Sequence, residues 1–233
     1  MNKFLAQAGV CSRREADQLI AAGEVKVNGK IVTELGTKVV PREDKVVFRG
    51  KLLQAEQYVY FLLNKPKNMI TTTKDPEGRK TVIDLVGPST DARIFPVGRL
   101  DRNTTGLLLL TNDGALAEKL THPSYRIRKL YHVRLNKDVP QEDLEALMNG
   151  VALEDGLAKA DLIDYVVGKG ANEVGIEIHS GRNRIVRRMF EHLGYRVDGL
   201  DRVAIGHHLT KKRLPRGKWR PLTDKEVGFL KMV

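Results

Sequence analysis

The chain has 233 residues, enough for one large domain or for a large domain and a small one. Lysine and arginine number 40 against 29 acidic residues, a formal net charge of +11, which predicts a polyanionic partner such as nucleic acid. The single cysteine, Cys11, excludes an intrachain disulfide and fits a reducing cytoplasm. Because no apolar run approaches membrane-spanning length, we expect a cytoplasmic protein without membrane contact.

The positive charge is concentrated at the two ends of the chain. Residues 1–50 hold nine basic and six acidic residues, and residues 58–175 hold sixteen of each. Residues 176–233 hold fourteen basic and six acidic residues and therefore carry +8 of the total. Basic segments flanking a neutral scaffold are typical of a protein that binds a phosphate backbone.

Residues 1–50 predict a small α+β module. A short helix is expected over residues 2–9, and Ser12 with Glu15 forms a capping box that starts a second helix. Alternating residues on both sides of Asn28-Gly29 predict a hairpin, because Asn-Gly is the strongest short hairpin signal. A closing strand is expected at residues 46–48.

Within this module, residues 5–17 and 23–29 resemble the alpha-L RNA-binding motif, whose second helix and hairpin bind structured RNA. The alternative for any single basic residue is an ordinary solvated charge, because phosphate contacts are shared among many side chains. The resemblance implies RNA contacts by four residues: Arg13, Arg14, Lys26 and Lys30.

A large domain is predicted over residues 58–233, joined to the module by a linker at 51–57 that lacks a clear period. The apolar run at 58–63 predicts a buried strand that ends at Asn64-Lys65-Pro66. A polar loop is expected at 70–80, close to the substrate. It contains Gly-Arg-Lys-Thr but no glycine directly before the lysine, so a nucleotide phosphate loop is rejected.

The stretch at residues 95–114 presents one acid, Asp101, between Arg99 and Arg102, in a predicted turn between two strands. Two interpretations stay open at this point. Asp101 is an ion-paired turn residue, or it is a charged carboxylate serving as a nucleophile.

The following elements predict an inward-facing tyrosine and an arginine-rich helix start. In a strand at 128–135, Tyr131 shares its face with Val133 and Leu135, so either a core residue or a site residue is possible. Arg184, Arg187 and Arg188 are either a solvated helix face or an anion site. Further elements are expected as helices at 115–120, 141–148 and 185–194, and strands at 160–167 and 173–178.

The C-terminal segment is basic and ends in a helix that follows a second capping box, formed by Thr223 and Glu226. Its tryptophan, Trp219, either stacks on a nucleic-acid base or is a partly buried anchor. The six histidines have no metal-ligand spacing, and the adjacent His207-His208 would point in opposite directions on a strand. We therefore predict no metal site.

Four stretches, residues 98–114, 129–133, 181–189 and 200–206, occur in the order found in pseudouridine synthases, which the chain resembles over nearly its whole length. The match is to the branch that modifies single uridines in ribosomal RNA, more specifically its large-subunit members. The resemblance implies an α+β fold in which the module precedes a mixed, largely antiparallel sheet with a central cleft. Ile185 stands where many relatives have glutamine, which puts a substrate contact there in doubt.

The same resemblance implies roles for eight residues of this sequence. It implies that Asp101 is the catalytic aspartate, Tyr131 the active-site tyrosine and Arg187 the arginine paired with the aspartate. The substrate-binding residues that it implies are Arg99, Leu100, Arg102, Arg184 and Leu200.

The implied reaction suits one carboxylate without a cofactor. Isomerising uridine breaks the bond from the base to the sugar, turns the uracil and rejoins it through C5, with no redox change. Glycoside hydrolases need two carboxylates because they activate water, whereas here the base stays in the pocket. The expected partner is ribosomal RNA, free or in an assembling large subunit, and a monomer is expected. A non-catalytic RNA-binding or ribosome-assembly protein is the alternative. A third interpretation, a basic DNA-binding protein, is not supported, because the sequence has no recognition-helix pattern.

Overall fold

The computed structural model describes residues 1–41, 43–206 and 208–232, and it divides into two compact units. Met1–Val59, with the short segments Asp91–Arg93 and Asn112–Gly114, form the N-terminal unit. The remaining residues form the large unit. Arg42 of the turn expected after the hairpin, and His207 of the histidine pair, lie outside the described residues.

The N-terminal unit packs two helices, α1 (Asn2–Gln7) and α2 (Arg13–Ala21), against a small antiparallel sheet with the order β2-β1-β3-β4. The capping box at Ser12 is confirmed, because its side chain accepts from the Glu15 amide and the Glu15 carboxylate accepts from the Ser12 amide. The hairpin is also confirmed: Asn28 and Gly29 both have positive φ, as a type I′ turn requires. The strands are β1 (Val25–Val27), β2 (Lys30–Ile31), β3 (Val46–Phe48) and β4 (Lys51–Leu52).

The strand β4 lies where the sequence predicted an irregular linker. Lys51 and Leu52 pair with Phe48 and Val47 of β3, so the first residues of the predicted 51–57 segment extend the sheet of the N-terminal unit. A strand of two exposed residues carries no alternation that a sequence pattern could reveal.

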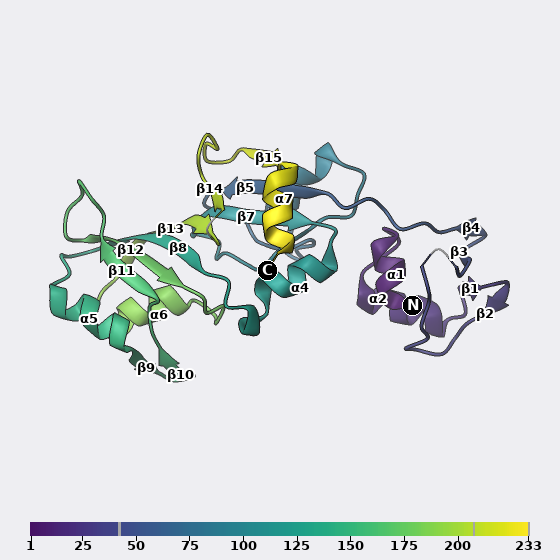
Figure 1. Ribbon diagram of the computed structural model, residues 1–233, viewed down its shortest axis with the longest axis horizontal. Coiled ribbons are helices and arrows are strands. Elements are labelled where there is room, and N and C mark those ends of the chain that lie inside the picture. The colour runs from purple at the N-terminus through teal and green to yellow at the C-terminus, as the bar shows by residue number, and fades with distance from the viewer. Residues whose placement is uncertain (42, 207, 233) are drawn as a thin grey trace. The chain divides into compact units, whose positions relative to one another are not determined.

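The large unit is built on a mixed sheet in which the described strands follow the order β11-β12-β8-β13-β7-β5-β15, with β14 beside β13 and β6 beside β7 (Figure 1). Among these strands β7 and β13 pair in parallel and the others antiparallel, as the largely antiparallel prediction requires. The strands are β5 (Tyr60–Lys65), β6 (Phe95–Pro96), β7 (Thr105–Thr111), β8 (Lys129–Leu135), β11 (Leu162–Tyr165), β12 (Glu173–Ile178), β13 (Val197–Ile205), β14 (Leu209–Thr210) and β15 (Trp219–Pro221).

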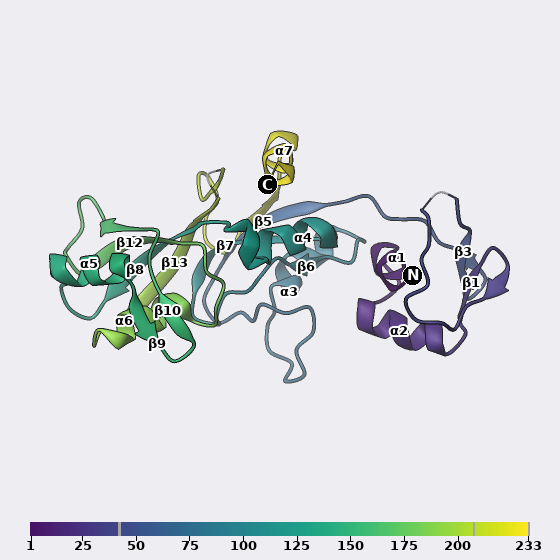
Figure 2. The ribbon, with the colours of Figure 1, turned by 60° about the horizontal axis from the view of Figure 1, so that its bottom comes forward.

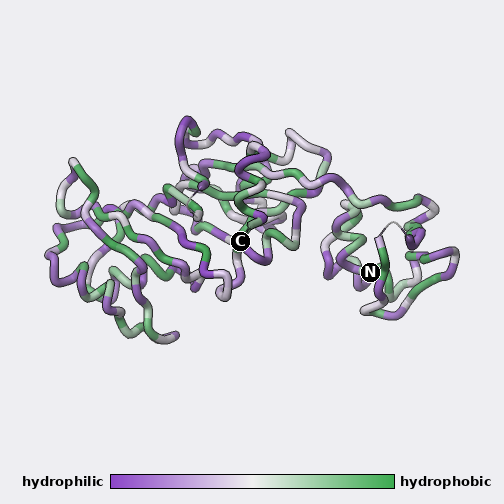
Figure 3. Tube along the Cα trace, viewed as in Figure 1, coloured by the Kyte–Doolittle hydropathy of each residue, from purple (hydrophilic) through white to green (hydrophobic). Residues whose placement is uncertain are grey.

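Helices cover the two halves of this sheet separately. Figures 1 and 2 show α4 and α7 beside β5 and β7, and α5 and α6 beside the half that contains β8 and β12. Hydrophobic residues line the central strands (Figure 3), and β5 and β7 are buried along their whole length. The helices are α3 (Ile83–Val86), α4 (Gly114–Thr121), α5 (Gln141–Asn149), α6 (Ile185–His192) and α7 (Asp224–Lys231), with short 3₁₀ turns at Gly87–Ser89 and Pro123–Tyr125.

Three features of the large unit refine the sequence expectations. The strand β5 does not end before Lys65 but includes it, so this lysine is buried. A short hairpin of β9 (Val151–Leu153) and β10 (Gly156–Ala158) was not expected. Trp219 is partly buried, with its ring edge-to-face with Phe61 at 5.4 Å, so the anchor interpretation is confirmed.

Candidate active site

Asp101 lies in a turn between β6 and β7, as the sequence predicts. We call residues 97–104 the Asp101 turn. Hydrogen bonds hold it on both sides of Asp101: the Thr71 hydroxyl donates to the Leu100 carbonyl at 2.8 Å, and the Asn68 amide donates to the Arg102 carbonyl at 2.9 Å. Thr71 belongs to the polar segment 70–80, so this segment does reach the acid's turn. The backbone that presents the carboxylate is therefore fixed.

Lys65 holds the Asp101 turn in place through hydrogen bonds to its backbone carbonyls, and this role was not predicted from the sequence. Its side chain is fully buried, and its ammonium group lies 2.9–3.2 Å from four backbone carbonyls. Burial lowers the pKa of Lys65 from 10.5 to about 8, Asp101 opposes the decrease, and Arg202 adds to it. The carbonyls belong to Pro66, Asp101, Arg102 and Thr104. The available signal was a lysine directly after a buried apolar run, because a lysine buried there requires polar partners.

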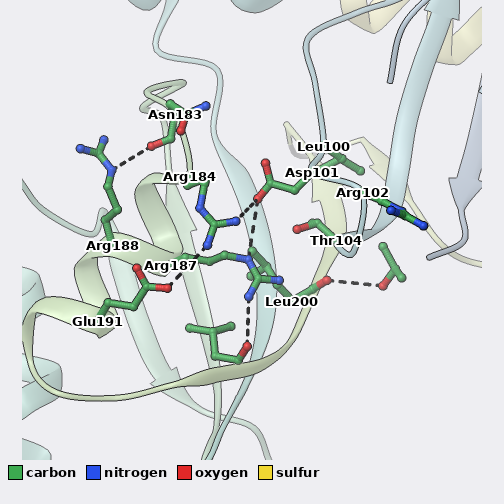
Figure 4. Close-up of polar contacts among 12 residues, drawn as sticks. Leu100, Asp101, Arg102, Thr104, Asn183, Arg184, Arg187, Arg188, Glu191 and Leu200 are labelled. Carbon is green, nitrogen blue, oxygen red and sulfur yellow. Dashed lines mark hydrogen bonds and ion pairs between the residues drawn. The ribbon is translucent and has the colours of Figure 1, made fainter. Parts of the chain in front are cut away.

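Two arginines from the start of α6 approach the Asp101 carboxylate (Figure 4). Arg184 Nη1 and Arg187 Nε lie 3.4 Å and 3.7 Å from Asp101 Oδ2. Arg187 is held from behind by donating to the Val197 carbonyl at 3.0 Å, and its side chain is 10% exposed. Burial, then Arg184, lower the pKa of Arg187, and Asp101 raises it again.

The other arginines of this segment hold the β9–β10 hairpin. Arg182 and Arg188 both form ion pairs with Asp155, at 3.0 Å and 2.9 Å. Two of the four cations therefore bind Asp155 and two approach Asp101, so the solvated-face alternative for this helix start is wrong.

A pocket opens above Asp101 within the large unit. Tyr131, Leu200 and Arg202 line it from the middle of the sheet, and all three are buried. Tyr131 of β8 is directly opposite Arg202 of β13, so the two side chains stand on the same face. Further lining residues are Gly98, Arg99, Leu100, Asp101, Thr104, Leu120, Thr121, Lys129, Gly181, Arg184, Val186 and Ile205.

Six of the eight residues implied by the resemblance line this pocket together: Arg99, Leu100, Asp101, Tyr131, Arg184 and Leu200. Arg187 lies behind the carboxylate instead. Arg102 is exposed and its side chain extends away from Arg184 and Arg187 (Figure 4), so the structure does not bring it into the pocket. Ile185 lines the pocket with a buried apolar side chain.

The four basic residues predicted to contact RNA lie in the N-terminal unit. All are exposed, and none forms an ion pair within the described part of the chain. Arg13 and Arg14 are the first two residues of α2. Lys26 pairs with Ile31 and Lys30 pairs with Val27. Because neighbouring residues of a strand point to opposite faces, the two lysines lie on opposite faces of the hairpin.

Within the described ranges, no group of three or more histidine, cysteine or acidic side chains could hold a metal ion. Nor does the described chain contain a helix long and apolar enough to cross a membrane. What the pocket does offer is a charged carboxylate on a fixed turn, an aromatic ring and a set of cations around them. Such a site can attack or deprotonate a sugar while a planar base stacks against the ring.

Comparisons with known proteins agree with this geometry. Residues 59–192 match the RNA pseudouridylate synthase family, and residues 2–46 match the S4 domain. Ribosomal large subunit pseudouridine synthase B of Bacillus subtilis is 45% identical over all of this chain and 96% of its own length. An uncharacterized RNA pseudouridine synthase of Aquifex aeolicus is 44% identical over 99% of this chain and 92% of its own. A crystal structure of a pseudouridylate synthase superimposes with a TM-score of 0.68 at 32% identity, covering 98% of both chains.

The chain therefore belongs to the RNA pseudouridylate synthase family, and it carries an S4 domain at its N-terminal end. It is an isomerase with an α+β fold, as the resemblance in the sequence implied. The alternative of a non-catalytic binding protein is not favoured.

Proposed function

We propose that this protein converts one specific uridine of large-subunit ribosomal RNA to pseudouridine. The observation that carries the proposal is the grouping of Asp101, Arg187 and Tyr131 around one pocket. The name of the Bacillus subtilis relative, similar along its whole length, supports the large ribosomal subunit as the source of the substrate.

In this proposal Asp101 acts on the sugar while the base remains bound. Its carboxylate either bonds to C1′ or removes the proton on C2′, and both routes release the uracil from C1′. Arg187 holds the carboxylate aimed at the pocket, because its own position is fixed by the Val197 carbonyl. Tyr131 stacks on the uracil and relays a proton when the base rejoins through C5.

The substrate nucleotide has to leave its helix to reach this pocket, which costs a few kcal/mol of unstacking. Binding energy for this step comes from phosphate contacts. We assign those contacts to Arg99 and Arg102 in the large unit and to Arg13, Arg14, Lys26 and Lys30 in the S4 domain. The protein acts as a cytoplasmic monomer, on free rRNA or on an assembling large subunit.

The test is pseudouridine mapping in rRNA from cells that lack the gene. Carbodiimide treatment followed by primer extension should show one large-subunit stop missing in the deletion strain and restored by the wild-type gene. The D101N gene should fail to restore it. A stop that persists in the deletion strain, or returns with D101N, would refute the proposal, and a missing small-subunit stop would correct the substrate.

A further inference from the structure

A buried and a half-buried cation on neighbouring strands form the floor of the pocket, and neither has been given a function so far. Arg202 of β13 is 4% exposed, and its Nε donates to the Leu107 carbonyl at 2.7 Å. Its Nη2 is also buried, yet it has no hydrogen-bond partner among the described residues. Arg202 and Asp101 line the same pocket.

Lys129 of β8 is the second cation of the floor. Its ammonium group donates to the Ile127 and His179 carbonyls at 2.9 and 3.1 Å, which uses two of its three protons. Burial and, to a smaller extent, Arg202 lower the pKa of Lys129 from 10.5 to about 8, and Asp161 opposes this decrease. Neither Lys129 nor Arg202 forms an ion pair with any carboxylate in the described parts of the chain.

An unpaired buried guanidinium N–H is costly, because a buried donor without a hydrogen-bond partner keeps its full desolvation penalty, and the penalty is larger for a charged group. The fold nevertheless keeps a second buried polar atom without a hydrogen-bond partner. The Thr104 hydroxyl lines the pocket, is buried and has no partner among the described residues. Unpaired donors converging on one cavity indicate a polar ligand that completes them.

The position of these donors favours the base of the nucleotide over its phosphate. Arg202 is directly opposite Tyr131 in the β8–β13 register, so a base stacked on that ring lies beside the guanidinium. The exposed arginines Arg99 and Arg184 stand at the rim, where a phosphate remains in contact with water.

We propose that Arg202 Nη2 donates to a keto oxygen of the target uracil and stabilises the negative charge that the base acquires during the reaction, with Lys129 adding a second positive charge. This assignment rests on the proposed function. It makes Arg202 a catalytic residue, and it defines a base-recognition subsite that takes a keto oxygen.

The charge arises at one step. When the C1′–N1 bond breaks, its electron pair stays on the uracil and spreads from N1 to the keto oxygens. C1′ receives in exchange either a bond to the Asp101 carboxylate or the electron pair of the C2′–H bond, whose proton passes to Asp101. The turned base then forms the C5–C1′ bond. On the first route this breaks the C1′–O bond and releases the Asp101 carboxylate; on the second, Asp101 returns its proton to C2′. C5 finally loses its proton and N1 gains one. No oxidant or reductant is consumed, so stabilising the anion lowers the barrier directly.

The experiment measures single-turnover rates on an rRNA fragment that carries either uridine or 5-fluorouridine at the target position. The loss of the starting nucleoside is followed by nuclease digestion and mass spectrometry. Fluorine withdraws electrons and stabilises the released base, so cleavage of the 5-fluorouridine substrate depends less on Arg202. We expect R202M to slow the uridine reaction on the order of 10²-fold or more, as loss of a donor to a developing anion does. The loss that R202M causes on the 5-fluorouridine substrate should be at least about tenfold smaller than its loss on uridine.

The variants R202K and K129M grade the effect. R202K keeps the charge without the second Nη group and should fall between wild type and R202M, while K129M should lose about tenfold. The matched control is R196M, which removes an exposed arginine paired with Asp198 at 2.8 Å and should retain the wild-type rate. Circular dichroism and thermal melting establish whether each variant is folded. If R202M is not folded, the comparison of uridine with 5-fluorouridine is made with R202K instead.

Equal losses on both substrates would overturn the assignment, because a structural role does not depend on the basicity of the leaving base. So would a loss of RNA affinity with an unchanged rate, which is the signature of a phosphate contact. Wild-type protein that left the uridine unchanged would instead refute the proposed function, and this assignment with it.

Discussion

The basic residues predicted to bind RNA in the S4 domain and three basic residues around the pocket of the large unit occupy opposite environments, although they are the same lysine and arginine side chains. In the S4 domain Arg13 and Arg14 are exposed and without ion pairs in the described chain. In the large unit Lys65, Arg187 and Arg202 are buried, and each donates to at least one backbone carbonyl.

This difference separates two functions of positive charge. Exposed cations attract a polyanion over distance and release counterions on contact, so their effect is broad and decreases with salt. Buried cations are screened little and fixed in position, so each acts on one group. The net charge of +11 therefore overstates the RNA-binding surface, because part of it serves the geometry of the pocket.

Replacing Asp101 with asparagine tests the catalytic half of this comparison and should have the largest effect. The amide can neither bond to C1′ nor take a proton, so the single-turnover rate should fall on the order of 10⁴-fold or more. RNA affinity, measured by filter binding, should stay within about threefold, since no phosphate contact is lost. A D101N protein that retained turnover would remove Asp101 from the mechanism.

The two arginines at the carboxylate should differ in proportion to their burial. R187M removes a side chain that is 10% exposed and held by the Val197 carbonyl, and it should lower the rate roughly 10²- to 10³-fold. R184M removes one that is 45% exposed, where solvent screens the interaction, and it should cost about tenfold. Equal losses in the two variants would show that burial does not set their contribution.

Lys65 predicts a pH dependence of stability. Its pKa is about 8 in the folded protein and near 10.5 when unfolded, so between these values the unfolded chain holds a proton that the folded chain has lost. The contribution of Lys65 to the free energy of unfolding therefore rises with pH across that window, by on the order of 1–3 kcal/mol, and is lowest below pH 8.

Urea unfolding of wild type and K65M from pH 7 to 10.5 measures this contribution as their difference. A constant difference would contradict the burial of a charged Lys65. Catalysis should change in the opposite direction, because the neutral amine has two N–H groups for four carbonyls and the Asp101 turn loosens.

The exposed cations should give the smallest effect and one that depends on salt. R13A/R14A should weaken RNA binding about tenfold and reduce the slope of log affinity against log salt by one to two units, at roughly 0.7 to 0.9 per lost phosphate contact. R49A is the matched control, because Arg49 is an exposed cation of the same unit already paired with Glu24 at 2.6 Å. An unchanged slope in R13A/R14A would exclude these two arginines from the RNA interface.

Features set by neighbouring residues were predictable from the sequence. The Ser12 and Thr223 capping boxes, the Asn28-Gly29 hairpin and the inward face of Tyr131 depend on spacings of one to three residues, and all are confirmed. The position of Asp101 between two strands is confirmed for the same reason.

Features set by distant residues were not predictable from pattern. The role of Lys65 was not visible in the sequence, because three of its four carbonyl partners lie 36 to 39 residues further along the chain. The proximity of Asp101 and Arg187 came from resemblance to a family, since nothing near either residue indicates the other. The strands of the β9–β10 hairpin have three residues each, too few to establish a period.

Gly106 gives the parallel contact between β7 and β13 a further consequence. A Cβ atom there would overlap the backbone of Arg202, and the residue has a φ of 110° that side chains rarely adopt. This contact joins the strand that follows Asp101 to the strand that carries Leu200 and Arg202. The absence of a side chain at Gly106 thus permits the close approach of these two strands, and any larger residue would move the Asp101 turn relative to Leu200 and Arg202.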